Sequence, residues 1–177
     1  MASHAEVREG AMGGTKDLSR FVKGAMLAVA TVLAGATIVA VARVLIGVTP
    51  STYEAKQVAV LIHLSSVLPA IPLGLWVLLA RKGDATHKLL GRIWGVLMLA
   101  AAGSAIFIRT INHGQFSPIH LFVPLVFLAL FRAIRAARAG RIALHKRLMW
   151  TLYGAGLLLP GLFAFLPGRL LWNWLML

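Results

Sequence analysis

The sequence predicts an all-α integral membrane protein, a bundle of five transmembrane helices, and three observations carry this prediction. Hydrophobic residues make up 59% of the 177 residues and charged residues 13%. Soluble domains contain roughly 45–50% apolar residues and about 25% charged residues. Five long stretches with few charges each approach the roughly 20 residues that a helix needs to cross a bilayer. Lys and Arg gather in alternate connections between these stretches, which is typical of membrane proteins.

The first span, 21–47, follows a polar segment, residues 1–20, that we expect to form a mobile cytoplasmic tail. The span is too long for the apolar core of a signal peptide and lacks a clear cleavage site, so we interpret it as an uncleaved anchor. Arginines at the ends of the third and fourth spans lengthen these helices if their charged heads reach the membrane surface. Residues 21–177 then form a single transmembrane domain. The four later spans are expected at 57–80, 89–108, 118–136 and 147–166.

The distribution of basic residues predicts that the N-terminus is cytoplasmic. Most of the 18 Lys and Arg residues lie in the tail and in the connections after the second and fourth spans. The opposite connections hold only Lys56 and Arg109, and the C-terminal segment only Arg169. This is the positive-inside pattern of a multi-pass protein. The net charge of +13 is thereby explained, and nucleic acid is not an expected partner because no basic face with interleaved aromatic residues lies outside these loops.

The composition also excludes several chemistries. The chain has no cysteine, which rules out disulfides, iron–sulfur clusters and covalently attached c-type haem. Asp and Glu together number only five. Paired-carboxylate hydrolysis and proton relays through carboxylates are therefore not expected.

Two segments of the chain resemble each other. His63 is followed 24 residues later by His87-Lys88, and His120 is followed 25 residues later by His145-Lys146. Each pair joins two spans across a basic loop, and both units run in the same direction. We infer a parallel repeat, 57–108 and 118–166, related by a pseudo-twofold axis along the membrane normal. Spans 2–5 then form a pseudo-twofold four-helix bundle, with span 1 outside the repeat.

The repeat pairs the four histidines in two layers. His63 faces His120 near the outer surface, and His87 faces His145 near the inner surface, roughly 20 Å away at about 1.5 Å per helical residue. Cofactor sites are commonly built from side chains on facing helices, and imidazole is a suitable ligand for iron. The sequence therefore predicts two haem b groups, each held by two of these histidines as metal ligands.

Cations and small residues complete the predicted sites. The carboxylates of the inner haem, its propionates, would pair with four cations, Lys88, Arg92, Lys146 and Arg147. Gly91 would leave room for a flat ring, as would Ala70 and Gly74 on the face of the second span that carries His63. Lys56 and Arg109 would serve the outer layer.

Each of these features also has a purely structural interpretation. Histidines at the membrane edge are often hydrogen-bonded structural residues, although ionisable residues within spans favour function. Small residues are common at helix contacts, and anionic lipid explains basic residues near the inner surface. His113, with His120 and Glu54, could form a metal site on the outer face, but the spacing matches no established pattern.

From His63 onward the chain resembles a widespread family of bacterial predicted membrane proteins without assigned function. The family has a His in one span, a His-Arg/Lys-x-x-Gly-Arg element opening the next, and a His-Arg/Lys-x-x-Met element opening a later one. Here these elements are 87–92 and 145–149, with Lys after each His, and the Trp that commonly precedes Met is replaced by Leu148. The resemblance implies the bacterial inner (cytoplasmic) membrane and supplies no activity.

The arrangement of the histidines also resembles that of the transmembrane ascorbate-reducing b-type cytochromes. That resemblance implies that His63 and His120 hold one haem and that His87 and His145 hold the other. Because little sequence beyond the histidines is shared, it is an analogy of architecture.

The leading hypothesis is therefore a b-type cytochrome that passes electrons across the lipid bilayer, from a donor such as a quinol or a small reductant. The alternative is a non-catalytic membrane protein that assembles with or stabilises a larger membrane complex, which the many Gly and Ala positions support equally well. A small permease is disfavoured because no span contains an acidic residue.

Overall fold

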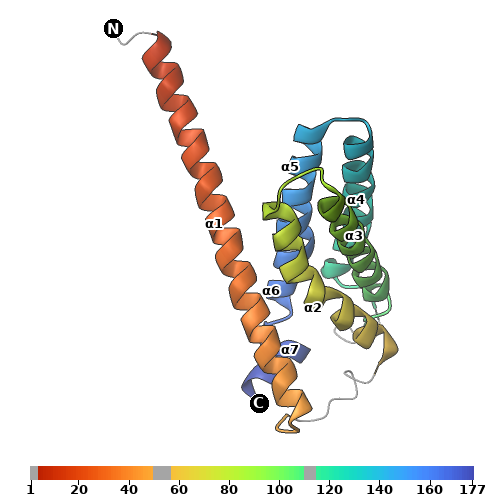
Figure 1. Ribbon diagram of the computed structural model, residues 1–177. Helices are drawn as coiled ribbons and strands as arrows, with labels where there is room; N and C mark the ends of the chain where they lie inside the picture. Colours follow the sequence, from red (N-terminus) through yellow and green to blue (C-terminus); the bar gives the residue numbers. More distant parts are fainter. Residues whose placement is uncertain (1–3, 50–56, 110–114) are drawn as a thin grey trace.

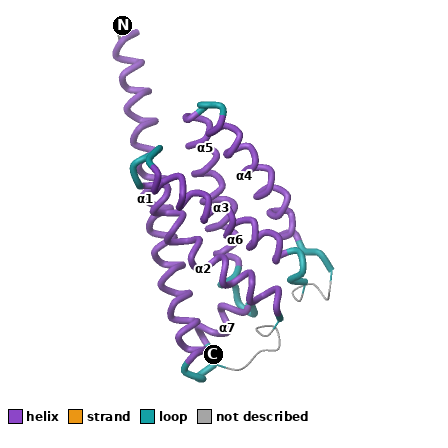
Figure 2. Tube along the Cα trace, turned by 45° about the vertical axis from the view of Figure 1, so that its right-hand side comes forward, coloured by secondary structure: helices purple, strands orange, loops and turns teal. Residues whose placement is uncertain are grey.

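The computed structural model describes residues 4–49, 57–109 and 115–177. These ranges contain helices joined by short loops, and no strand occurs in them (Figures 1 and 2). The helices labelled η are a 3₁₀ turn (η3) and a π-helical segment (η4). The bounds are α1 His4–Leu45, α2 Val58–Leu79, α3 Ala85–Ala105, η3 Pro118–Leu121, α4 Phe122–Arg138, α5 Ile142–Tyr153, η4 Gly154–Leu158, α6 Leu159–Phe163 and α7 Leu170–Met176.

The protein is a multi-pass membrane protein by the length and composition of its helices. Four segments are long and apolar enough to cross a bilayer. The segment predicted as the fifth span is divided into α5, η4 and α6, which follow one another directly, so the count of five stays a prediction. The four segments are Arg20–Leu45, Val58–Leu79, Ala85–Ala105 and Pro118–Arg138.

The first helix begins earlier than the sequence led us to expect. It starts at His4, within the residues predicted to form a mobile tail, and Figure 1 shows it extending well beyond the rest of the molecule. Adding residues to an existing helix avoids the cost of nucleation, so polar residues can prolong an apolar helix. The mobility of this segment stays a prediction.

Helices α2 to α5 form two antiparallel hairpins beside α1. Both hairpin loops lie at the end of the molecule where α1 begins, and α7 lies at the opposite end (Figure 1). Asp84 starts α3 by accepting a hydrogen bond from the backbone N–H of His87 at 2.7 Å, a standard N-cap. The basic segments of the sequence, at the start of α1 and in the two hairpin loops, lie at this one end (Figure 1).

Helix α2 is bent midway, as Figure 1 shows, and it contains Pro69 and Pro72. Each proline lacks an N–H and cannot bond to the carbonyl one turn earlier, which kinks a helix. Two buried rings from other helices reach this part of α2. Trp94 donates to the carbonyl of Ala70 at 2.9 Å, and the Tyr153 hydroxyl donates to that of Ile71 at 3.0 Å.

Helix α1 packs against the side of the bundle. Lys23 places its ammonium group 5.7 Å from the ring centre of Trp150 on α5, which is a cation–π contact. Near the other end, Arg43 donates to the backbone carbonyl of Trp174 on α7 at 3.0 Å. Both ends of α1's apolar part are therefore attached to later segments of the chain.

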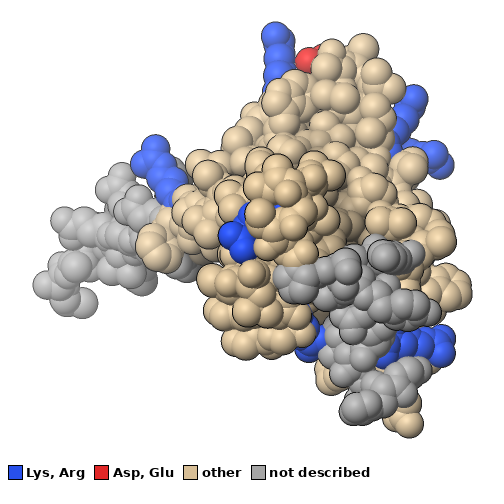
Figure 3. All heavy atoms as spheres, turned by 90° about the horizontal axis from the view of Figure 1, so that it is seen from below, with Lys and Arg blue, Asp and Glu red and all other residues tan. Residues whose placement is uncertain are grey.

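The outer faces of the helices are apolar. Val32, Ile38, Val96 and Leu128 are each at least 60% exposed, which is typical of side chains that contact lipid and unusual in a soluble monomer. Seen from the end that carries α7, most of the visible described surface belongs to residues other than Lys, Arg, Asp and Glu (Figure 3).

Candidate functional site

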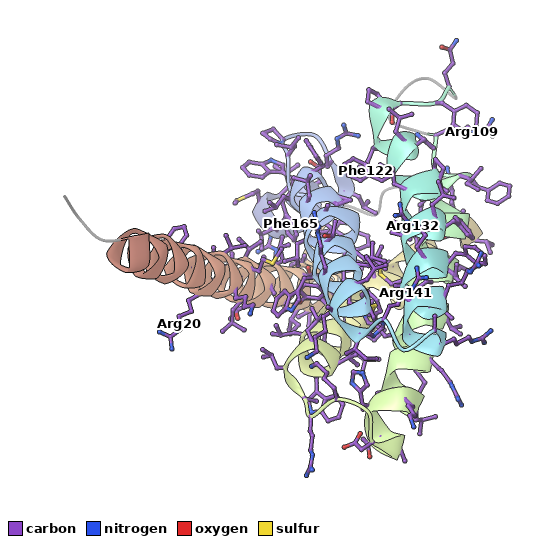
Figure 4. All side chains as sticks on the ribbon, turned by 90° about the horizontal axis from the view of Figure 1, so that it is seen from above. Arg20, Arg109, Phe122, Arg132, Arg141 and Phe165 are labelled. Atoms are coloured by element: carbon purple, nitrogen blue, oxygen red, sulfur yellow. The ribbon has the colours of Figure 1, made fainter. Side chains whose placement is uncertain are left out.

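A cavity of about 620 Å³ lies between the helices, and both His63 and His120 line it. Its walls come from α1, α2, α3, η3, α4, η4, α6 and the segment that leads into α7. The volume falls within the roughly 300–1,000 Å³ of typical ligand sites. Figure 4 looks along the bundle from the opposite end and labels two of the aromatic wall residues, Phe122 and Phe165. The two outer histidines predicted to face each other thus share one cavity.

His63 is held by the neighbouring helix α3. Its Nδ1 lies 2.8 Å from the backbone carbonyl oxygen of Ala101 and 3.4 Å from the hydroxyl of Ser104. A carbonyl can only accept a hydrogen bond, so the proton of the neutral ring lies on Nδ1 and the lone pair on Nε2. Metal-ligating histidines almost always have this kind of partner on the second nitrogen.

His120 is held by the turn that precedes α4. Its Nδ1 lies 3.1 Å from both the backbone carbonyl and the backbone N–H of Ser117, so either neutral tautomer finds a partner there. The ring meets Phe116 edge-on, with ring centres 5.0 Å apart. Its Nε2 is buried and has no hydrogen-bond partner. Buried polar atoms are normally paired, so this nitrogen is available to a ligand.

The inner histidines lie near each other on α3 and α5. His145 places Nδ1 3.0 Å from the backbone carbonyl of Ala133, which repeats the arrangement of His63. His87 differs, because its Nδ1 is buried without a hydrogen-bond partner. The two rings are close enough for their charges to interact. The structure places His63 and His120 on one cavity, while the pairing of all four histidines around metals stays a prediction.

The predicted inner cations lie on the surface. All four are exposed: Lys88, Arg92, Lys146 and Arg147. Figure 4 shows two further arginines, Arg132 and Arg141, on the hairpin of α4 and α5. The pairing of the four predicted cations with cofactor carboxylates stays a prediction. A nearby residue that the sequence analysis did not single out, Lys82, donates to the carbonyls of Val77, Leu78 and Ala80 at the end of α2. Burial there, and to a lesser extent the charge of Lys146, lowers the pKa of Lys82.

The small residues of α2 have a different use from the predicted one. A Cβ atom on Gly74 would collide with the rings of Trp94 and Tyr153, so Gly74 and Ala70 make room for these side chains. Gly91 is less restricted, since a Cβ there would only touch Val77, 3.9 Å away. The middle of the bundle is therefore filled by protein, and the cavity lies nearer the end that carries α7.

Neither the described histidines nor the described acids form a group of three potential metal ligands. An iron site in this part of the chain would therefore use pairs of imidazoles. His113 and Glu54, which the sequence disfavours as a metal site, lie outside the described residues.

A known family matches the chain over residues 60–167 and is described as "Predicted membrane protein (DUF2306)". The chain belongs to this family. The match includes all four paired histidines and ends just before Gly168. No curated protein and no solved structure matches the chain.

Two arginines near the cavity were not assigned to a site from the sequence. Arg43 was counted as part of an apolar span, yet its side chain fastens α7. Arg169 was counted only for topology, yet it lines the cavity. No sequence signal marks either role, because each depends on how the C-terminal segment folds back.

Proposed function

We propose that this protein is a membrane b-type cytochrome that holds two haems, each between two histidines, and passes electrons across the membrane. The observation that carries the proposal is that His63 and His120, which lie 57 residues apart in the sequence, line one largely apolar cavity. Bis-imidazole coordination needs two such rings on opposite sides of a flat ligand.

The outer pair fits haem by the state of its nitrogens. His63 and His120 each have a backbone carbonyl near Nδ1, at 2.8 and 3.1 Å, and the Nε2 of His120 has no partner in the described part of the protein. When Nδ1 carries the proton, Nε2 presents its lone pair, which is the form that binds a metal. His63 is thereby prepared for ligation, whereas His120 would be in this form only when its Nδ1 donates to the Ser117 carbonyl in place of accepting from the Ser117 N–H.

The inner pair supports a second site. His145 has its Nδ1 held by a carbonyl at 3.0 Å, and His87 carries a buried Nδ1 without a partner. The pairing of α2 with α4 and of α3 with α5 is what a pseudo-twofold bundle requires. The exposed Lys88, Arg92, Lys146 and Arg147 surround this end and would attract carboxylates.

The proposed topology has five crossings, because α5, η4 and α6 together run from Ile142 to Phe163 without a loop. The N-terminus and both basic loops lie at one end (Figure 1), which supports a cytoplasmic N-terminus in the bacterial inner membrane. A haem between two imidazoles carries one electron at a time. The role of the chain is to hold such groups at two depths and to keep them apart from water, with a quinol or a small reductant as donor.

Absorption spectroscopy tests this proposal. The protein is produced in haem-replete cells and purified in detergent, and spectra are recorded before and after reduction with dithionite. We expect an α-band of a six-coordinate b-type haem and about two haems per chain. A colourless preparation that is folded by circular dichroism contradicts the proposal. A colourless preparation with a stoichiometric membrane partner would instead support the alternative, a subunit that stabilises a larger complex.

A further inference from the structure

The cavity that holds His63 and His120 contains one formal charge. Apart from the two histidines and the charged residue, the wall is apolar except for Thr37, whose hydroxyl donates to the Leu33 carbonyl of its own helix at 2.6 Å. Arg169 is the one Lys, Arg, Asp or Glu among the described wall residues. Its guanidinium has neither a hydrogen bond nor an ion pair within the described ranges. A charge beside an apolar cavity is costly unless it is paired.

The other arginines at this end of the molecule are already engaged. Arg109, which the sequence suggested for the outer site, donates to the carbonyl of Ile106 at 3.1 Å and lies 4.2 Å from the ring centre of Phe116. Arg43 is bonded to the carbonyl of Trp174. Lys56 lies outside the described residues. Of the described arginines here, Arg169 alone both reaches the cavity and has its donors free.

The backbone holds Arg169 in a defined place. Gly168 has φ of +81°, a left-handed conformation that glycine adopts readily, and it turns the chain back toward the bundle. The N–H of Arg169 donates to Leu166 at 3.0 Å, and its carbonyl accepts from Asn173 at 2.9 Å. The helix that follows is anchored by Trp174, which is 5% exposed.

We propose that Arg169 binds the propionate carboxylates of the haem held by His63 and His120. This inference rests on the proposed function. A guanidinium pairs with a carboxylate through two parallel N–H···O bonds. Arg169 immediately precedes α7, at the end of the bundle nearest the cavity, where the two propionates of haem b would be expected. Arg169 lies two residues beyond the segment matched by the family.

The test compares two ligands on three proteins. Apo-protein carrying His145→Leu, which leaves only the outer site intact, is titrated with haem b and with its dimethyl ester, in which both carboxylates are blocked. The same titrations are made with Arg169→Gln and with Arg109→Gln added. Absorbance gives the dissociation constants, and circular dichroism confirms that each variant is folded.

We expect the His145→Leu protein to bind haem b roughly 10- to 100-fold more tightly than the diester, which is the range for a charge-assisted pair. Adding Arg169→Gln should abolish this preference, and Arg109→Gln should preserve it. Equal binding of the two ligands before Arg169 is changed, or a preference that survives Arg169→Gln, overturns the assignment of Arg169 and leaves the cytochrome intact. Failure of both ligands to bind any of the three apo-proteins overturns the proposed function as well.

Discussion

Three imidazoles of this protein have a backbone carbonyl beside Nδ1, and the Nδ1 of His120 also accepts a hydrogen bond from the N–H of Ser117. The Nδ1 atoms of His63, His120 and His145 lie 2.8, 3.1 and 3.0 Å from the carbonyl oxygens of Ala101, Ser117 and Ala133. The carbonyls of Ala101 and Ala133 come from a neighbouring helix and cannot be identified from spacing along the chain, whereas that of Ser117 lies three residues before His120. The sequence singles out the rings, their pairing stays a prediction, and the orientation of His63 and His145 is set by tertiary contacts.

Replacing His63 by Leu should remove one haem and leave the other. The outer site would lose one of its two ligands, whereas the inner pair on α3 and α5 is untouched. Pyridine haemochrome analysis should give about one haem per chain, and His145→Leu should give the same content with the other haem remaining. His4→Leu, at the start of α1, serves as control and should keep both. Loss of both haems from either single variant would contradict two independent sites.

Gly74 should not tolerate even one added carbon. A Cβ there would meet the rings of Trp94 and Tyr153, which are buried and each hydrogen-bonded to α2, so they cannot move away cheaply. We expect Gly74→Ala to lower the free energy of unfolding by about 1–3 kcal/mol, measured as a lower Tm in detergent. Gly103→Ala is the matched control on α3, where no atom lies within 4 Å. An equal Tm for the two variants would show that the aromatic packing is not tight.

At the scale of elements, the bend of α2 bears on the position of the proposed outer site. The halves of α2 on either side of Pro69 and Pro72 run in different directions (Figure 1), and His63 lies in the first half. A proline within a span predicts a kink, but the direction of the bend cannot be obtained from a sequence. It depends on which carbonyls are freed and on what packs against them, here the side chains of Trp94 and Tyr153.

Straightening α2 should damage the outer site selectively. In the double variant Pro69→Ala/Pro72→Ala, the restored N–H groups can bond to the carbonyls of Ser65 and Leu68, which favours a straight helix. His63 would then move relative to His120. We expect loss of the outer haem with retention of the inner one, read from the haem content and from the redox titration.

Pro124→Ala provides the control for this experiment. Pro124 lies in the first turn of α4, where a missing N–H leaves no intrahelical bond unmade. The substitution should leave both haems in place. If the double variant also retains both, the bend is not what positions His63.

At the scale of the whole molecule, family membership, the all-helical class and the presence of several membrane-spanning helices are confirmed, because hydropathy constrains them strongly. The fifth span, the pseudo-twofold arrangement and the pairing of four histidines stay predictions. The start of α1, the division of the last span by a π-helical segment and the docking of α7 could not be predicted. These features depend on contacts such as Arg43 with Trp174, between residues 131 positions apart, for which a single sequence gives no signal.

The topology can be tested directly, since the chain has no cysteine and each introduced thiol is unique. Ala139 is exposed in the loop between α4 and α5, and Val48 is exposed after α1 at the other end. We expect a membrane-impermeant maleimide to label Val48→Cys in intact cells with a permeabilised outer membrane, and Ala139→Cys only in inverted vesicles. The reverse pattern would place the N-terminus outside and would contradict the positive-inside interpretation.

The wall of the cavity contributed by Phe165, Gly168, Arg169 and Leu171 is the part that leaves the ribosome after every other wall is made. Until that stretch has emerged and folded back, the chamber stays open on one flank. In the proposed cytochrome, a haem could therefore enter before the C-terminal segment closes the site, and detachment of that segment would open a route for the haem to leave.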